Sequence, residues 1–373
     1  SPESLEARMS AWNEPFHAVD TSADDTVLIA FTSGSTGQPK ATMHFHRDII
    51  AASDCFPKST TQLRPDDICM GTPPLAFTFG LGGLLIFPMR VGAATVLLER
   101  LTPESMLQAI QDYHVTSTWS SPLFYRQMSE LTSRFDLSTM RQSISAGESL
   151  PVSTRTMWRE ATGIEIIDGI GSTEMFHIFI ASTPEEVRPG ATGKAIPGYQ
   201  ACILDDNGNP LPPDTVGRLA VKGPTGCRYL ADERQRTYVQ HGWNLTGDAY
   251  LMDKDDYFWF QARTDDMIIT VGYNVAGPEV EGALLMHPAV AECAVVGAPD
   301  PERGTIIKAF VVLKPSYVRD AAMVKTLQDF VKQHIAPYKY PRAIEIVDAL
   351  PRAGTGKLQR YRLRQQEQGS ANT

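Results

Sequence analysis

Residues 31–41 read FTSGSTGQPKA and combine hydroxyl side chains, glycines and one lysine in a single short segment. Gly34 and Gly37 let backbone N–H groups approach an anion closely, and Lys40 adds a positive charge beside them. Four side chains of the segment can donate hydroxyl hydrogen bonds: Thr32, Ser33, Ser35 and Thr36. The composition therefore predicts a phosphate-binding loop rather than an ordinary surface turn.

The flanking sequence indicates how this loop is held. VLIAF at 27–31 is a short apolar run that we interpret as a buried strand, and ATMHFHRDIIAA at 41–52 is expected to enter a helix. Strand, polar loop and helix is the usual context of a nucleotide-binding loop. The loop is not of the Walker A type, because GQPK at 37–40 lacks the Gly-Lys-Ser/Thr ending.

Further motifs follow along the chain. They are SAGESLP at 145–151, GIGSTE at 169–174, TGD at 246–248, ARTDD at 262–266, VGYNVAGPEVE at 271–281 and GTGKLQR at 354–360. TSGSTGQPK resembles the phosphate loop of the adenylate-forming superfamily, which includes acyl- and aryl-CoA ligases, peptide-synthetase adenylation domains and luciferases. Because the other six motifs occur in that family's order, the chain is identified as a member. The resemblance implies an α/β adenylate-forming-enzyme fold with a mobile α+β C-terminal domain.

The pattern of strand-like and helix-like segments changes along the chain and divides it into parts. Strand-like and helix-like segments alternate up to about residue 190, which favours a parallel sheet with helices on its faces. Short β-like runs separated by turn sequences follow at 191–262 and indicate a small β-rich subdomain. We therefore predict an AMP-binding core over 1–262, a hinge at 263–266 and a C-terminal domain at 267–373. The tail from Gln365 is expected to be disordered.

Composition narrows the class of protein. The 373 residues carry a formal net charge of −9, which argues against a general affinity for nucleic acid or an anionic membrane. Five cysteines without a CxxC spacing indicate neither a disulfide framework nor a zinc site. The N-terminus does not resemble a signal peptide, and glycines, Pro88 and Arg90 interrupt the most apolar stretch, at 75–98. We predict a cytoplasmic enzyme, with the choice between monomer and homodimer left open.

Nucleotide contacts are implied by the resemblance. Glu174 offers the carboxylate oxygen that Mg²⁺ prefers, and the family places this residue on the metal and Thr173 on a phosphate. Asp248 is expected to accept hydrogen bonds from the ribose hydroxyls, assisted by Arg263. Ile170 stands where the family often has an aromatic residue, so we expect an aliphatic surface against adenine. The remaining positions expected at the nucleotide are Ala146, Gly147, Glu148, Asp168 and Gly169.

Lys357 is the expected catalytic lysine, acting with Thr173 and Glu174. Gly354 and Gly356 beside it make its approach to a closed site flexible. When a carboxylate attacks the α-phosphate of ATP, negative charge accumulates on the transferring oxygens, and a preorganised cation stabilises that transition state. A general base is not required, because the nucleophile is already an anion.

A second half-reaction, with coenzyme A, is implied by the segment at 271–281. It resembles the loop that lines the pantetheine tunnel in the family, with Gly272 and Tyr273 at its start. One site would then present Lys357 in the first step and this loop in the second. Asp265 resembles the family's hinge residue, and we expect it to absorb the change in backbone angles.

The acid is predicted to be aromatic. LAFTFGLGG at 75–83 resembles the family's acyl-pocket segment, and GIGSTEMFHIFIAS, RPGATGK and KGPTGCRYL resemble 2-aminobenzoate-CoA and benzoate-CoA ligases. Flat apolar walls suit a benzene ring. His177 could accept a hydrogen bond from an ortho amine or pack against the sheet. We predict an ATP-dependent aryl-acid CoA ligase, with 2-aminobenzoate preferred over benzoate. The expected substrate residues are Phe77, Phe79, Gly80, Gly171 and His177.

Two other interpretations stay open. Family members carry an αβ subdomain before the phosphate loop, whereas 31 residues precede Thr32, so we expect an N-terminally truncated core that binds ATP weakly. The chain could then be an inactive nucleotide-binding fragment, although it retains Lys40, Glu174, Asp248 and Lys357. It could also be an adenylation module that loads a carrier protein, although no carrier-like segment follows Lys357.

Overall fold

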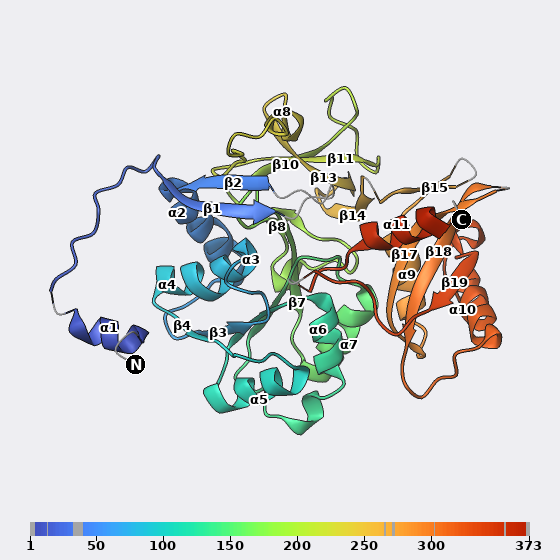
Figure 1. Cartoon of the computed structure of the whole chain (residues 1–373), viewed down its shortest axis with the longest axis horizontal. Coiled ribbons are helices and arrows are strands. Elements are labelled where there is room, and N and C mark those ends of the chain that lie inside the picture. The colour runs from blue at the N-terminus through green and yellow to red at the C-terminus, as the bar shows by residue number, and fades with distance from the viewer. Residues whose placement is uncertain are drawn as a thin grey trace.

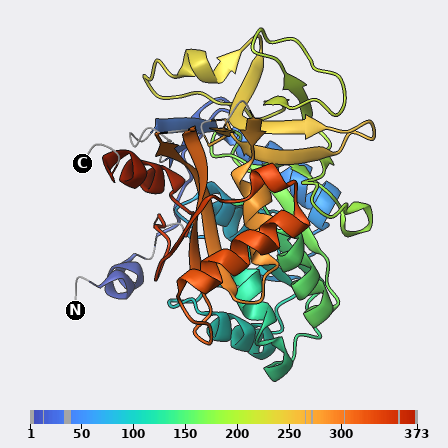
Figure 2. The same ribbon diagram turned by 90° about the vertical axis from the view of Figure 1, so that its right-hand side faces the viewer.

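The computed structural model describes residues 4–12, 14–32, 40–264, 266–270, 273–301, 303–353 and 356–370. For residues 369 and 370 it describes the backbone only. Figure 1 shows an αβ part in blue to green, a β-rich part in yellow above it, and a C-terminal part in orange to red beside it. The 90° view in Figure 2 shows the same C-terminal part packed in front of the other two. A short helix, α1 (Leu5–Ala11), precedes the αβ part.

A seven-stranded sheet forms the centre of the αβ part, in the order β4-β3-β5-β6-β7-β8-β9. The strands from β4 to β7 pair in parallel, whereas β8 and β9 pair antiparallel. The parallel α/β organisation predicted from the alternating pattern is therefore confirmed. The strands are β3 (Ile68–Gly71), β4 (Ala94–Val96), β5 (Ser117–Ser120), β6 (Gln142–Ser145), β7 (Ile166–Gly171), β8 (Ile178–Ala181) and β9 (Lys194–Ala195).

Amphipathic helices accompany this sheet. In α5, Thr102 and Ser105 form a capping box at the start, and the helix buries Met106, Leu107 and Ile110. The helices are α2 (His46–Phe56), α3 (Thr78–Leu81), α4 (Phe87–Val91), α5 (Pro103–Tyr113), α6 (Pro122–Ser129) and α7 (Val152–Thr162). Single π or 3₁₀ turns are η1 (Pro57–Thr61), η2 (Gly82–Ile86), η3 (Thr132–Arg134) and η4 (Pro184–Glu186).

Trp119 on β5 is the largest side chain in the centre of the core and is fully buried. Its ring lies 6.0 Å from the ring of Phe56, 6.2 Å from Phe87 and 5.9 Å from His177, measured between centroids. Replacing Trp119 with alanine should lower the free energy of unfolding by about 3–5 kcal/mol, because burial is lost and a cavity remains. Urea unfolding measures the change. Trp12 is 73% exposed, so Trp12→Ala is the matched control, and equal small shifts in both variants would contradict this role.

The β-rich part contains a five-stranded antiparallel sheet, as the short β-like runs predicted. The order is β10-β11-β13-β12, and β14 also pairs with β13, along its residues 248–252. Its elements are β10 (Gln200–Leu204), β11 (Gly217–Lys222), α8 (Gln235–Tyr238), β12 (Val239–Gln240), β13 (Trp243–Met252) and β14 (Phe258–Arg263).

The C-terminal part has its own sheet and core. β17 pairs antiparallel with β18, and β18 pairs parallel with β19. Val295, Ile307 and Leu327 lie in a core separate from that of the αβ part. The elements are β15 (Ile268–Thr270), β16 (Tyr273–Val275), α9 (Gly277–Leu285), β17 (Val290–Asp300), β18 (Gly304–Leu313), α10 (Ala321–His334), η5 (Pro337–Lys339), β19 (Ala343–Ile346) and α11 (Arg360–Ser370).

The predicted disorder of the tail is wrong for residues 365–370, which belong to α11. Leu363 of this helix is 4% exposed in a cluster with Phe310. Glu367 receives an ion pair from Lys308, with Nζ 2.7 Å from Oε1. The polar composition of the tail gave no sign of these two contacts, which attach α11 to the C-terminal sheet.

The segment around the phosphate loop also differs from the prediction. VLIAF does form a strand, β1 (Thr26–Thr32), but Val27, Ile29 and Phe31 are 44%, 43% and 65% exposed. β1 belongs to a two-stranded sheet, so it is not enclosed as a central strand would be. The loop is followed by an antiparallel strand, β2 (Lys40–Phe45), and α2 begins only at His46. The prediction of a buried strand was therefore wrong. The segment 41–52 does enter a helix, as predicted, but only after it has formed β2.

Candidate active site

Two of the motifs leave neighbouring parallel strands at the same edge of the central sheet. Ser145 at the end of β6 pairs with Asp168 on β7, so the SAGESLP and GIGSTE segments emerge side by side. The carboxyl ends of parallel strands are where α/β sheets bind ligands. Figure 1 shows the hairpin of β1 and β2, the β-rich sheet and the C-terminal part arranged around the top of β7.

Tyr229 connects the phosphate-loop lysine to the carboxylate expected to hold the metal. Its hydroxyl donates to Glu174 Oε1 at 2.6 Å and accepts from Lys40 Nζ at 3.4 Å. The Lys40 ammonium also lies 5.1 Å from the centroid of the Tyr229 ring. Burial and the Glu174 carboxylate raise the pKa of Tyr229 far above its ordinary value, so the phenol stays a neutral donor.

Backbone pairing holds Tyr229 in this position. Met43 N donates to Arg228 O, and Leu230 N donates to Ala41 O, both at 2.8 Å. Tyr229 lies in the KGPTGCRYL segment, but no motif marked it as a site residue. It is 55 residues from Glu174, and contacts of this segment with β2 and with Met175 bring the two together.

Side chains fix the turn that carries Thr173 and Glu174. The buried His44 ring donates from Nε2 to the Thr173 carbonyl oxygen at 2.8 Å. Thr225 Oγ1 donates to the Met175 carbonyl oxygen at 2.8 Å. Phe176 has a φ of +70°, in the left-handed region that non-glycine residues rarely adopt. The turn is therefore held on both sides in a specific conformation, and His44 packs as a structural residue of it.

The residues expected near adenine differ in their surroundings. Asp168 is 8% exposed, burial raises its pKa to about 7, and Oδ1 has no hydrogen-bond partner among the described residues. Gly147 has a φ of +91° and open space where a Cβ would lie. Ala146 is buried, Ile170 is half-buried, and a Cβ on Gly169 would meet Ile178. Asp168 thus offers an unpaired acceptor at the strand ends.

Asp248 and Arg263, expected at the ribose, face each other across β13 and β14. Arg263 Nη1 donates to Asp248 Oδ1 at 3.1 Å and to the Thr246 carbonyl oxygen at 3.2 Å. Gly247 between them has a φ of +77°, and a Cβ there would lie 2.8 Å from Arg263 Nη2. The TGD sequence therefore requires glycine for its backbone angle and for the approach of the guanidinium.

Lys357 from the C-terminal segment lies in the electrostatic field of the same pair. Its side chain is exposed, and its ammonium lies within electrostatic range of charged groups from the core. Desolvation and the Arg263 guanidinium lower its pKa, whereas Asp248 and Glu148 oppose the shift. The structure therefore brings together Lys357, Asp248, Arg263 and Glu148, which are far apart in the sequence.

Glu148 binds the C-terminal segment rather than standing free on the adenine side. Its Oε1 accepts from Arg352 Nη1 at 3.2 Å and from the backbone N–H of Leu358 at 3.0 Å. Leu358 directly follows Lys357, so Glu148 fixes the backbone beside the expected catalytic lysine. No motif indicated this contact, because 210 residues separate Glu148 from Leu358.

Tyr273, expected beside the path of coenzyme A, lies on β16 of the C-terminal part. It is 54% exposed on β16, and its ring is 4.7 Å from that of Tyr338, between centroids. Its ring therefore packs against η5 of the C-terminal part, to which Lys357 also belongs. Thr32 pairs with Lys40 at the end of the β1–β2 hairpin, so both ends of the phosphate loop meet. The other predicted positions lie outside the described residues: Ser33, Gly34, Ser35, Thr36, Gly37, Asp265 and Gly272.

His177 is enclosed by aromatic rings. It is 3% exposed, with centroids 5.7 Å from Phe79, 4.5 Å from Phe87 and 5.9 Å from Trp119. Burial lowers its pKa to about 3, so the ring is neutral. Nε2 lies 3.4 Å from the Phe79 carbonyl oxygen, and Nδ1 has no partner among the described residues. The ring packs against the sheet and keeps one unused nitrogen.

The other expected substrate residues form the surroundings of this ring. Phe77 is 39% exposed and Phe79 half-buried. A Cβ on Gly80 would lie 2.2 Å from the Pro74 carbonyl oxygen, and one on Gly171 would lie 2.6 Å from the His177 carbonyl oxygen. Both glycines therefore permit close backbone packing beneath the aromatic side chains.

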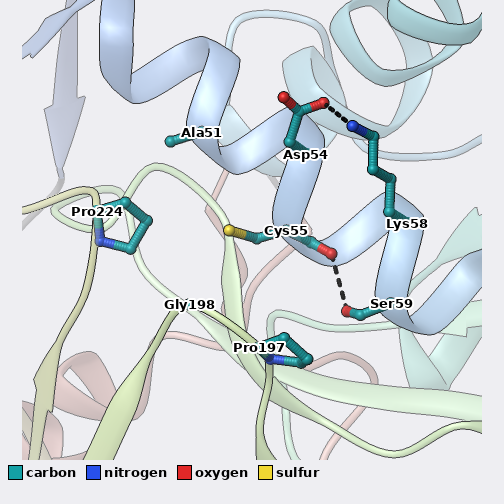
Figure 3. Close-up of a pocket in the computed structure, with 8 residues that line it drawn as sticks. All are labelled: Ala51, Asp54, Cys55, Lys58, Ser59, Pro197, Gly198 and Pro224. Carbon is teal, nitrogen blue, oxygen red and sulfur yellow. Dashed lines mark hydrogen bonds and ion pairs between the residues drawn. The ribbon is translucent and has the colours of Figure 1, made fainter.

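A separate hollow of about 470 Å³ lies where α2 meets the loops of the β-rich part (Figure 3). Asp54, Cys55 and Lys58 line it from α2 and η1, and Pro197 and Pro224 from the loops. Asp54 pairs with Lys58 at 2.8 Å. None of the predicted site residues is among those that line this hollow.

The side chains available as metal ligands limit how a metal ion could bind. The described part of the chain contains no group of three or more His, Cys, Asp or Glu side chains placed to hold a metal ion. Mg²⁺ in nucleotide enzymes is bound by one or two carboxylates together with substrate phosphates. Glu174 beside the phosphate loop fits that arrangement.

Within the same described residues, no helix is long and apolar enough to cross a membrane.

Comparisons with known proteins agree with these observations. Residues 2–229 match the AMP-binding enzyme family, and residues 279–357 match the AMP-binding enzyme C-terminal domain. Benzoate-CoA ligase of Thauera aromatica is 38% identical over 97% of this chain and 70% of its own length. Human mitochondrial acyl-coenzyme A synthetase ACSM3 is 35% identical over 97% of this chain, which spans 64% of that relative.

Among solved structures, the anthranilate CoA ligase AuaEII in complex with anthranoyl-AMP superposes with a TM-score of 0.94 at 37% identity. The match covers 99% of this chain and 73% of that one. The phosphate-loop, GIGSTE and GTGKLQR motifs thus occur within a fold that matches throughout the chain. The chain belongs to the AMP-binding enzyme family of adenylate-forming enzymes, and its relatives there are acyl- and aryl-CoA ligases.

Proposed function

We propose that this protein is an ATP-dependent aryl-acid CoA ligase. It adenylates a small aromatic carboxylate with release of pyrophosphate, and then transfers the acyl group to coenzyme A with release of AMP. The observation that carries the proposal is the hydrogen bond between Glu148 of the core and the Leu358 N–H beside Lys357, with Asp248 and Arg263 within electrostatic range of the lysine. A cation is thereby held beside the pair expected to bind the ribose.

In the first step, the substrate carboxylate attacks the α-phosphate, and Lys357 stabilises the negative charge that accumulates on the transferring oxygens. Lys40 and the hydroxyls of the phosphate loop bind the other phosphates, together with Thr173. Glu174, oriented by Tyr229, holds Mg²⁺. The metal, when bound, neutralises charge on the phosphate oxygens.

The nucleoside is bound at the strand ends. Asp168 Oδ1 is a buried acceptor without a partner among the described residues, and an amino group such as that of adenine would satisfy it. Ile170 supplies an apolar surface beside it. Asp248 already accepts from Arg263, and its remaining lone pairs are available to ribose hydroxyls.

For the second step, we propose that the C-terminal part turns about Asp265 and brings the segment 271–281 toward the acyl-adenylate. Gly272 and Tyr273 then line the path of the pantetheine arm. Two features support this movement: Tyr273 is exposed and packs against Tyr338 in the present arrangement, and the C-terminal part has its own hydrophobic core. A rigid body turning about a short connection is a common form of domain motion.

The proposed acid is aromatic, with 2-aminobenzoate preferred over benzoate. Phe77 and Phe79 offer aromatic surface beside the turn that follows β7, and Gly80 and Gly171 allow the backbone to pack closely beneath them. His177 packs against Phe79, and its Nδ1, which has no partner among the described residues, can accept from an ortho amine. The 38% identity to a benzoate-CoA ligase and the likeness to an anthranilate CoA ligase support an aromatic ring.

The test is the relative kcat/KM of the full-length protein for benzoate, 2-aminobenzoate, 2-hydroxybenzoate and octanoate, with coenzyme A as acceptor. We expect the aromatic acids to exceed octanoate. A site arranged for the amine leaves a polar group unpaired with benzoate, which costs roughly 1–3 kcal/mol and corresponds to about 5- to 150-fold. A preference for octanoate would overturn the aryl assignment, and equal use of benzoate and 2-aminobenzoate would overturn only the role of the amine.

A further inference from the structure

Arg126 on α6 reaches from the core into the C-terminal part. Its Nη2 donates to the carbonyl oxygens of Leu285 and Val290, each at 3.2 Å. Leu285 is the last residue of α9, and Val290 is the first residue of β17. Only 8% of Arg126 is exposed, so the guanidinium is buried at the contact between the two parts.

The helix α9 needs such a partner. The carbonyl groups of the last helical turn have no intrahelical donor, and a cation there also interacts favourably with the helix dipole. The last turn of α9 contains no basic residue. Arg126 therefore supplies, from the other part of the molecule, both the donor and the positive charge that this helix end lacks.

A continuous set of contacts leads from α9 to Lys357. Glu281, one turn before Leu285, binds Arg360 with both oxygens: Oε1 to Nε at 3.1 Å and Oε2 to Nη2 at 2.7 Å. Bidentate pairs of this kind fix orientation as well as distance. Glu281 also accepts from the backbone N–H of Val295 at 2.8 Å, so it is itself held by β17. Arg360 is three residues after Lys357.

Two attachments therefore hold the segment that carries the lysine. Glu148 binds Arg352 and the Leu358 N–H directly. Arg126 holds the end of α9, whose Glu281 holds Arg360. A body attached at a single point can still rotate about it, whereas attachment at two separate points restricts its orientation.

We propose that Arg126 is a positioning residue for adenylation: it fixes α9 and, through Glu281 and Arg360, the placement of Lys357 beside Asp248 and Arg263. The proposal rests on the adenylation step of the proposed function. When the C-terminal part turns away for the second step, Arg126 releases both carbonyls. Its contribution is therefore confined to the first half-reaction.

The exposed pair between Lys314 and Glu130 provides a matched comparison. Lys314 Nζ lies 2.7 Å from Glu130 Oε1 across the same interface, but the two side chains are 33% and 48% exposed. Exposed pairs contribute little, whereas a buried charge without its partners is costly. Glu130 is one turn along from Arg126, at the end of α6. Glu130→Gln should therefore leave both half-reactions within about 2-fold of the wild type.

The experiment compares Arg126→Met, Arg126→Lys and Glu130→Gln in the full-length protein. Adenylation is measured as ATP–pyrophosphate exchange, with the acid that the wild type adenylates fastest. Thioester formation is measured separately, from the supplied acyl-adenylate and coenzyme A. We expect Arg126→Met to lower the kcat of exchange by about 10- to 100-fold with little change in the KM for ATP, because two charge-assisted hydrogen bonds are lost. Thioester formation should stay within about 3-fold. Arg126→Lys should recover part of the loss.

Equal losses in both half-reactions, or no loss in either, would overturn the positioning role. If Arg126→Met does not fold, Arg126→Gln, which retains a donor without the charge, decides the same comparison. If none of the acids tested supports ATP–pyrophosphate exchange by the wild type, the proposed function itself is refuted. A wild type that exchanges only with a non-aromatic acid would refute the aryl assignment and leave the comparison of the variants intact.

Discussion

Replacing Lys357 with alanine is expected to slow adenylation by about 10²- to 10⁴-fold, which corresponds to roughly 3–5 kcal/mol of transition-state stabilisation. The ammonium is held beside Asp248 and Arg263 by contacts of Glu148 with the adjoining backbone. Thioester formation from a supplied acyl-adenylate should continue, because the thiol attacks the carbonyl carbon rather than phosphorus, and the proposed turn of the C-terminal part removes Lys357 from the site in that step. ATP–pyrophosphate exchange measures the first step, and release of AMP from the acyl-adenylate measures the second.

Arg362 provides the control for this prediction. It is an exposed cation five residues beyond Lys357, in the basic segment that begins α11. If general positive charge were sufficient, Arg362→Ala would also slow adenylation. We expect it to change either step by less than about 2-fold. A Lys357→Ala variant that loses both half-reactions equally would contradict the assignment of the lysine to phosphoryl transfer.

Replacing Glu174 with glutamine is expected to lower adenylation by about 10²- to 10³-fold, because the site loses its carboxylate ligand for Mg²⁺. The amide oxygen of glutamine can still accept from Tyr229, so the contact that orients this side chain is retained. The concentration of Mg²⁺ needed for half-maximal exchange should rise. Titration of Mg²⁺ at fixed ATP, by exchange rate and by nucleotide binding, measures the effect.

Glu185 is the matched control, since it is an exposed glutamate in η4. Glu185→Gln removes the same charge from the chain without approaching the site, and we expect an unchanged dependence on Mg²⁺. An unchanged dependence in Glu174→Gln would show that this carboxylate does not hold the metal. A loss of nucleotide binding that is the same with and without Mg²⁺ would lead to the same conclusion.

The larger features of the fold could be predicted from local pattern. Apolar runs alternating with amphipathic helices identified the parallel sheet, and short runs between turn residues identified the β-rich sheet. The errors occurred where local pattern is ambiguous. VLIAF has the composition of a central strand but lies in a two-stranded sheet with exposed side chains. Residues 365–370 are polar enough to suggest disorder, yet Leu363 and Glu367 anchor their helix.

The site was predictable only in part, for a related reason. The motifs identify Lys40, Glu174 and Lys357 because the residue types at those positions suit phosphate, metal and developing charge. They do not identify the partners that position these residues. Tyr229 is 55 residues from Glu174, and Arg126 is 159 residues from Leu285. Such pairs depend on strand pairing and on contact between separate parts of the fold, which leave no periodic signal in the sequence.

The site is proposed to join an aromatic carboxylate to AMP. ATP–pyrophosphate exchange in the full-length protein, measured without coenzyme A, tests this most directly. Without coenzyme A only the adenylation step can occur, and its reversal returns labelled pyrophosphate to ATP. We predict exchange that is absent without an acid and saturates with benzoate or 2-aminobenzoate. Exchange supported by octanoate but by neither aromatic acid would contradict the claim, as would binding of ATP without exchange in the presence of every acid tested.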